Sequence, residues 1–306
     1  MKRYNRREVI SLLTASTLVG STYLTVERQG RKNAGSLWAA DGSSPDSSGQ
    51  QPVQTVEASP LATLPRLGKL AARSSKVISA SPLSVGFETL DRKMFQPERA
   101  YPRLAQLGVK WARVQTGWSR CEPEKGRYDF AWLDAVVDQL LEIGIQPWFN
   151  LGYGNRLYTP EAKDASAVGW APIFTEEAHT GWTQFVQALT KHFAKRVRHW
   201  EIWNEPNIAT FWRPQKPNPK DYVELVKLTA PIIRQEVPQA VVIGGALAGM
   251  PIQYLQECLQ AGLANYVDRL SFHPYGPTPE KNYTQRVEQF RKLLTQYRPG
   301  LALWQG

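Results

Sequence analysis

The sequence of 306 residues predicts an α/β fold, namely a (β/α)8 TIM barrel that is incomplete, with about seven strands and the eighth βα unit missing. Strand-like and helix-like segments alternate from residue 84 onward at intervals of roughly 30 to 50 residues, which indicates parallel strands with crossover helices. No glycine fingerprint of a doubly wound sheet follows the first strand. Polar and aromatic residues instead follow the ends of many different strands, which is typical of a barrel rim.

The predicted strands are short segments rich in β-branched, aromatic and aliphatic residues. They cover residues 84–90, 110–116, 146–151, 199–204, 240–246, 269–275 and 301–305. The predicted helices carry apolar residues at helical spacing, and the first two end at Gly108 and Gly144, which suit a helix C-terminus. They cover residues 97–107, 132–143, 176–196, 219–236, 251–263 and 280–297.

Composition excludes several classes of protein. The 42% of apolar residues can bury a sizeable core, so wholesale disorder is excluded. Two cysteines cannot form a disulfide framework or a four-thiolate zinc site, and neither His-Glu-x-x-His nor Gly-x-Ser-x-Gly occurs. We therefore expect no cofactor. The net charge of +10 is divided evenly: residues 1–40 hold 7 basic and 2 acidic groups (+5), and the other +5 is spread over the rest. No nucleic-acid partner is expected from such a distribution.

The N-terminus carries the features of an export signal. A basic start is followed by residues 9–26, which contain no charged side chain. The pair Arg6-Arg7 resembles a twin-arginine signal; a Sec signal or an uncleaved membrane anchor are the alternatives. We therefore expect residues 1–40 to be an export signal or N-terminal anchor of a periplasmic or extracellular protein. Residues 41–75 are poor in apolar side chains and are expected to be a flexible linker, which leaves residues 76–306 as the barrel domain.

The segment 200–207, Trp-Glu-Ile-Trp-Asn-Glu-Pro-Asn, is the central motif. The fourth strand is predicted to end in Asn204-Glu205, because Pro206 cannot continue the ladder. Glu205 would then stand on the rim, where burial among aromatic rings would raise its pKa toward that of a general acid. The plainer interpretation is a strand-end glutamate paired with an arginine. Glu201 is expected to be a satisfied polar group inside the barrel.

Asn204-Glu205-Pro206 resembles the acid/base signature of the retaining glycoside hydrolases of clan A. Three further segments, residues 111–118, 122–130 and 270–276, resemble the second-strand, following-loop and sixth-strand segments of the same clan. The similarity extends over roughly residues 84 to 306 and is greatest to the family 39 β-xylosidase group.

The resemblance implies a role for each matching residue. Glu205 would be the acid/base, and Asn204 would hold the sugar 2-hydroxyl. Arg113 would orient the nucleophile, and His273 and Tyr275 would line the sugar subsite. A hydrogen-bonded core histidine is the alternative for His273.

Two further residues are candidates for substrate binding. Asn150 lies near the carboxyl end of the third predicted strand, and Trp304 in the seventh could stack on a sugar face. Core packing is the alternative for Trp304. The implied activity is retaining hydrolysis of O-glycosidic bonds in an oligosaccharide or polysaccharide, as in β-xylosidases and other β-glycosidases.

The second carboxylate of the retaining mechanism is not in the sequence. In the clan the nucleophile is a glutamate at the end of the seventh strand, whereas no acidic residue follows Glu288 here. We therefore expect a C-terminally truncated enzyme whose nucleophile would lie just beyond residue 306. The alternative is a catalytically inactive carbohydrate-binding TIM-barrel protein. Retention of Asn204, Glu205 and Arg113 favours the enzyme, because binding alone does not need these three.

Overall fold

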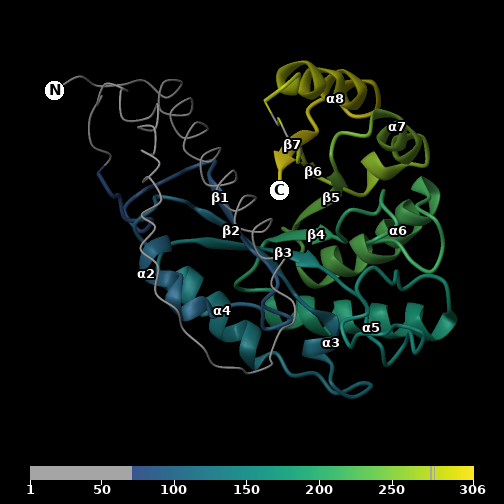
Figure 1. Cartoon of the computed structure of the whole chain (residues 1–306), viewed down its shortest axis with the longest axis horizontal. Helices are drawn as coiled ribbons and strands as arrows, with labels where there is room; N and C mark the ends of the chain where they lie inside the picture. Colours follow the sequence, from purple (N-terminus) through teal and green to yellow (C-terminus); the bar gives the residue numbers. More distant parts are fainter. Residues whose placement is uncertain (1–70, 276–277, 279) are drawn as a thin grey trace, which may run out of the picture. The chain divides into compact units, whose positions relative to one another are not determined.

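The computed structural model describes residues 71–275, 278 and 280–306. Seven parallel strands form one sheet in sequential order, β1 to β7, and each strand pairs in parallel with the next (Figure 1). The strands are β1 Ser84–Phe87, β2 Trp111–Gln115, β3 Gln146–Leu151, β4 His199–Ile202, β5 Val241–Ala248, β6 Arg269–His273 and β7 Ala302–Gln305. The predicted fold class, an incomplete barrel of seven strands, is confirmed.

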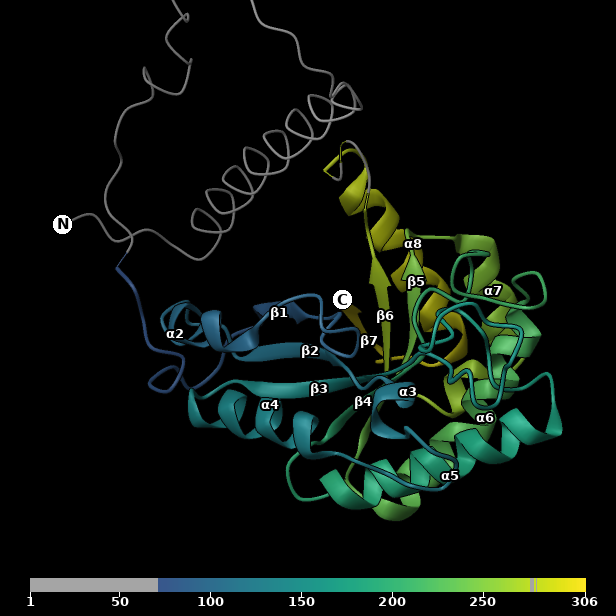
Figure 2. The ribbon, with the colours of Figure 1, turned by 60° about the horizontal axis from the view of Figure 1, so that its bottom comes forward.

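Helices follow the strands and cover the outer face of the sheet, where Figure 2 shows α4, α5 and α6. The helical elements are η2 Pro97–Arg99, α2 Tyr101–Leu104, α3 Trp118–Cys121, α4 Ala131–Glu142, α5 Glu176–Phe193, α6 Pro219–Glu236, α7 Ile252–Gln260, η3 Leu263–Asn265 and α8 Tyr283–Tyr297. Among the described residues, no helix combines the length and the apolar character that crossing a membrane requires.

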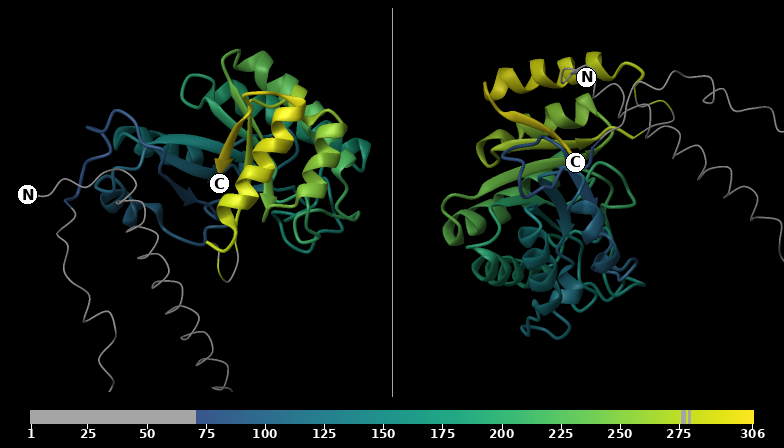
Figure 3. Two further views of the ribbon diagram at one scale, coloured as in Figure 1. Left: turned by 90° about the horizontal axis from the view of Figure 1, so that it is seen from above. Right: turned by 90° about the vertical axis from the view of Figure 1, so that its left-hand side faces the viewer.

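Local sequence signals explain where the long helices begin. Thr175 caps α5 by accepting a hydrogen bond from the Ala178 N–H. Asn218 caps α6 in the same way, and Pro219 occupies the first helical position, where its missing N–H costs nothing. At the other end of the domain, α8 lies beside β7 (Figure 3), and its Phe290 ring packs against Phe272 of β6.

The single helix predicted over residues 97–107 is wrong. The segment forms the 3-10 turn η2 and then the one-turn helix α2, because Pro97 and Pro102 lack the N–H groups that a continuous helix would use. The short helix α3 was not predicted. The strand predicted over 199–204 ends at Ile202, two residues before the Asn-Glu pair. The expected export signal lies outside the described residues, as do residues 41–70 of the expected linker.

Alternation along the strands separates two sets of side chains. In β3, Phe149 points outward and its ring packs edge-on against Phe193 of α5 and against Trp200 of β4. Trp148 and Asn150, one residue to either side, therefore point to the inner face. The same period of two places Arg113 and Glu201 on the inner face, since Glu201 pairs in register with Asn150. The inner face of the sheet thus carries the polar residues predicted from sequence.

Candidate active site

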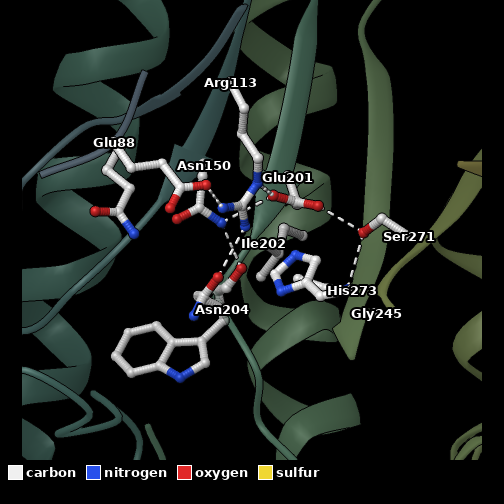
Figure 4. Close-up of polar contacts among 12 residues, drawn as sticks. Glu88, Arg113, Asn150, Glu201, Ile202, Asn204, Gly245, Ser271 and His273 are labelled. Carbon is white, nitrogen blue, oxygen red and sulfur yellow. Dashed lines mark hydrogen bonds and ion pairs between the residues drawn. The ribbon is translucent and has the colours of Figure 1, made fainter. Parts of the chain in front are cut away.

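Arg113 of β2 is the centre of a buried polar cluster (Figure 4). Its Nε donates to Glu201 Oε2 at 2.6 Å, its NH1 to Glu88 Oε1 at 2.5 Å, and its NH2 to Asn204 Oδ1 at 2.9 Å. Burial alone would lower the pKa of the guanidinium, but the Glu201 and Glu88 carboxylates outweigh it and raise the pKa of Arg113. A permanent cation is therefore held on the inner face of the sheet.

Glu201 of β4 is fully buried and has partners for both carboxylate oxygens. Oε2 accepts from Arg113 and from Asn150 Nδ2 at 3.0 Å, and Oε1 accepts from Ser271 Oγ at 2.5 Å. The prediction of a satisfied polar group inside the barrel is confirmed. Because Glu201 binds side chains from β2, β3 and β6, it fixes these strands' inner faces relative to one another.

An unusual backbone turn follows β4 and presents the Asn-Glu pair. Trp203 and Glu205 have φ angles of 69° and 50°, in the left-handed region that residues with a Cβ rarely adopt. Contacts on three sides hold the turn: the Trp203 N–H donates to Leu151 O, Asn150 Nδ2 donates to Trp203 O, and the Glu205 N–H donates to Ala246 O. The strand therefore ends because this turn leaves the ladder before Pro206 is reached.

The carboxylate of Glu205 lies against His273 of β6. Glu205 Oε1 is 2.7 Å from His273 Nδ1, and both side chains are at least nine-tenths buried. No hydrogen bond joins Glu205 to an arginine among the described residues, so the plainer interpretation of an arginine pair is not what the structure shows. One carboxylate oxygen is engaged by the imidazole, which leaves Oε2 as the oxygen that a ligand can reach.

The end of β7 reaches the same cluster. A Cβ built on Gly306 would lie 3.0 Å from His273 Nε2 and 3.8 Å from Arg113 Nε. His273 Nε2 is buried and has no hydrogen-bond partner among the described residues. A side chain at this edge of β7 would therefore point at the imidazole and the guanidinium.

The structure brings together four of the predicted site residues, Arg113, Asn204, Glu205 and His273. Asn150 belongs to the cluster as a support, because its amide donates to Glu201 and to the Trp203 carbonyl. Tyr275 lies beside the cluster: the residue is 75% exposed, and its ring centroid is 5.7 Å from that of His273.

Trp304 lies apart from this cluster. Its ring stacks on Trp148 at 4.7 Å and on His199 at 5.5 Å, deeper in the sheet's inner face. Contact of Trp304 with a sugar stays a prediction, since its observed partners are other aromatic rings and the Arg269 guanidinium, 4.7 Å from the centroid of its ring.

Four members of the cluster were not predicted from the sequence, and only two of them could have been found from the pattern of the strands. Glu88 follows β1 and Tyr153 follows β3, both in loops whose approach to Arg113 depends on the folded chain. Gln115 and Ser271 lie two residues from Arg113 and from His273 on the same strands, so strand periodicity could have found them. No cluster of metal-ligating side chains occurs in the described part of the chain.

Comparisons with known proteins found relatives of this chain. The profile of glycosyl hydrolases family 39 matches residues 106–297, more than half of the chain. The β-xylosidase of Geobacillus stearothermophilus is 28% identical over 176 residues, which are 53% of this chain and 34% of that protein. The β-xylosidase of Caldicellulosiruptor saccharolyticus is 27% identical over 236 residues, 69% of this chain and 44% of that protein.

A solved structure shares both fold and sequence similarity. A family 39 β-xylosidase from Caulobacter crescentus superposes with a TM-score of 0.59 at 26% identity, over 76% of this chain and 54% of that one. The chain thus spans between about a third and a half of the length of the relatives it matches.

Proposed function

The chain belongs to glycosyl hydrolase family 39, and from this premise we propose that it contributes to a retaining glycosidase acting on β-xylosides or similar β-glycosides, with Glu205 as the acid/base. One observation carries the proposal. The Glu205 carboxylate stands beside Asn204 and His273 at the carboxyl edge of the sheet, and the end of β7 points at the same His273. A retaining glycosidase needs one carboxylate on each side of the scissile bond, about 5–5.5 Å apart.

Each side chain has a part in the proposed reaction. Glu205 would protonate the leaving oxygen through Oε2 while His273 holds Oε1. Asn204 would present its amide N–H to the sugar 2-hydroxyl, because Arg113 occupies its carbonyl oxygen. The attacking carboxylate would stand at the end of β7, where Arg113 could keep it ionised. The substrate would be an oligosaccharide or a polysaccharide.

An external nucleophile tests the proposal on the 306-residue chain. Residues 289–306 include no acidic residue and position 306 is glycine, so within these 306 residues a small anion can take the place of the attacking carboxylate. With an aryl β-xyloside and azide, we expect azide nitrogen to attack C1 as the C1–O bond breaks. The product would be the α-xylosyl azide of inverted configuration, identified by NMR.

The acid/base role is tested by Glu205→Gln with two leaving groups. Dinitrophenolate departs without a proton, so its release should hardly change. Unsubstituted phenol needs the proton, so its release should slow by about 10²–10⁴-fold. Glu257→Gln, an exposed glutamate of α7, is the matched control and should behave as wild type. Equal losses on both leaving groups would exclude Glu205 as the acid. Xyloside binding without any turnover would favour the catalytically inactive carbohydrate-binding protein.

We also propose that residues 1–40 direct export, as the basic start before the uncharged residues 9–26 suggests. Replacing Arg6 and Arg7 by lysine should abolish export by the twin-arginine route, measured by fractionation of the host cells. The control replaces Arg28 and Arg31 by lysine. Unchanged export of the Arg6/Arg7 variant would leave a Sec signal or an anchor.

A further inference from the structure

Tyr153, in the loop after β3, has a hydroxyl group without a role in the proposed reaction. Its ring is buried and fixed: it stacks on Phe211 at 5.3 Å with the planes 8° apart, and it meets Trp203 edge-on at 6.0 Å. The guanidinium of Arg92 lies over the ring, 5.4 Å from its centroid. The position of the hydroxyl oxygen, Oη, is therefore set by packing.

The first neighbour of this hydroxyl is Asn204, whose Nδ2 lies 3.0 Å from Tyr153 Oη. The orientation of the Asn204 amide follows from its other contact. Arg113 NH2 can only donate, so the atom it meets at 2.9 Å must be the carbonyl oxygen Oδ1 (Figure 4). The Asn204 atom that faces Tyr153 is thus the NH2 group, and Tyr153 Oη is the acceptor.

The second neighbour is Gln115, whose Nε2 lies 3.4 Å from Tyr153 Oη. The Gln115 carbonyl oxygen accepts from the Thr89 N–H and from Arg92 NH2, both at 3.3 Å. Both of those groups are donors, so the amide of Gln115 must turn its own NH2 group toward Tyr153. The tyrosine oxygen therefore faces two donors.

This arrangement leaves the tyrosine proton free. The oxygen of Tyr153 accepts from two amides, and no acceptor for its O–H lies within hydrogen-bond distance among the described residues. Burial raises the pKa of the Tyr153 hydroxyl, although the Arg113 and Arg92 charges oppose it, so the proton is retained near neutral pH. A buried donor without a partner is costly, which indicates that something else accepts this hydrogen bond.

We propose that Tyr153 donates this hydrogen bond to the 2-hydroxyl oxygen of the bound sugar, beside the remaining N–H of Asn204. The proposal rests on the proposed function, which assigns the 2-hydroxyl to Asn204. A hydroxyl oxygen has two lone pairs, so it can accept from both the tyrosine and the amide. Tyr153 is then a specificity-determining residue that recognises an equatorial hydroxyl next to the anomeric carbon.

The experiment compares two probes, methyl β-D-xylopyranoside and its 2-deoxy analogue. Their dissociation constants are measured by NMR titration with wild type, Tyr153→Phe and Tyr158→Phe. Tyr153→Phe keeps the ring that stacks on Phe211. Tyr158→Phe is the matched control, because it removes a buried tyrosine hydroxyl that binds Glu122 and not the cluster.

Wild type and Tyr158→Phe should both prefer the 2-hydroxyl probe. Tyr153→Phe should bind that probe about fivefold more weakly, the value of one ordinary hydrogen bond, and should bind the 2-deoxy probe as wild type does. Equal weakening for both probes, or no change for either, would overturn the role of Tyr153 and leave the proposed function standing. Failure of wild type to bind either probe would overturn both.

Discussion

Two layers of side chains on the inner face of the sheet differ in how they are held together, although the same strands supply both. The polar layer consists of Arg113, Asn150, Glu201 and Ser271. The aromatic layer consists of Trp111, Trp148, His199 and Trp304. In β2, β3 and β4 the aromatic-layer residue lies two positions before the polar-layer residue, so both face inward at successive levels.

The two layers differ in the interactions that hold them together. Every charged group of the polar layer has a partner within hydrogen-bond distance, although Asn150 Oδ1 is buried without a partner among the described residues. In the aromatic layer the indole N–H of Trp148 is buried without a partner among the described residues, and cohesion comes from ring contacts such as Trp148 on Trp304. Burial, together with the Arg269 and Arg198 charges, lowers the pKa of His199 to about 4, so this histidine is neutral near pH 7. Ion pairs and hydrogen bonds therefore hold together the layer next to Glu205, whereas contacts between aromatic rings hold together the layer below it.

The largest effect is expected from Glu201→Gln in the polar layer. The variant keeps the size of the side chain but removes the charge that pairs with Arg113 and leaves the buried guanidinium with the partly exposed Glu88 alone. Breaking a buried ion pair from one side costs about 3–5 kcal/mol, so the free energy of unfolding in urea should fall by that amount. The control Glu257→Gln should change it by less than about 0.5 kcal/mol. A loss no larger than the control's would mean that charge pairing does not hold this layer.

Trp304→Ala tests the aromatic layer. The side chain is only partly buried on an edge strand, so the loss of unfolding free energy should be about 2–3 kcal/mol, below the 3–5 kcal/mol of a fully buried aromatic ring. Xyloside affinity should not change, because the ring contacts Trp148 and His199 and not the polar layer. A large loss of affinity measured by NMR titration would instead support the sequence-based prediction that Trp304 stacks on a sugar.

A pH titration distinguishes the layers by the charge of His199. Its folded pKa of about 4 lies below the ordinary value of 6.5, so the unfolded chain binds more protons between these values. Stability is therefore complete above pH 6.5 and is lost as the pH falls toward 4. We expect a loss of about 1–2 kcal/mol, less than the full shift implies because the ring is partly exposed. His199→Phe should lack this part of the pH dependence. Identical profiles of stability against pH for the variant and the wild type would mean that another group titrates.

The sequence predicted the elements whose signals are local. The third strand, 146–151, and the helix 219–236 have the predicted bounds, because both combine clear periodicity with flanking glycine, proline or a capping residue. The end of β4 was misplaced because the left-handed turn at Trp203 depends on contacts with β3 and β5, which no local pattern records.

The site was predictable to the extent that its members lie in a strand or directly after one: Arg113 lies in β2, His273 ends β6, and Asn204 and Glu205 follow β4. These side chains meet because alternate strands of a barrel contribute inward side chains to the same layer. Tyr153 could not be found in this way, since its hydroxyl reaches Asn204 through a loop whose path is set by packing on Phe211. The sequence also could not assign Trp304 to a layer, because a shift of two residues along a strand keeps the inward direction and changes the level.

The smallest expected effect comes from Ser271→Ala, which removes a neutral hydroxyl that donates to Glu201 Oε1 and accepts from the Ala246 N–H. Glu201 keeps Arg113 and Asn150, but the Ala246 N–H loses its acceptor, so the loss of unfolding free energy should be about 1–2 kcal/mol. In the Glu201→Gln background, Ser271→Ala should lower the free energy of unfolding by less, because the charged acceptor of the serine hydrogen bond is already gone. A double-mutant cycle in urea should therefore give an interaction energy of at least about 0.5 kcal/mol.

The same cycle between Ser271→Ala and Trp304→Ala tests whether the two layers are coupled. Ser271 and Trp304 are partners in register on β6 and β7, so strand pairing alone would couple them as well. If each layer is held separately, these two losses should add, and coupling as strong as that with Glu201 would show that strand pairing, and not the division into layers, transmits the effect.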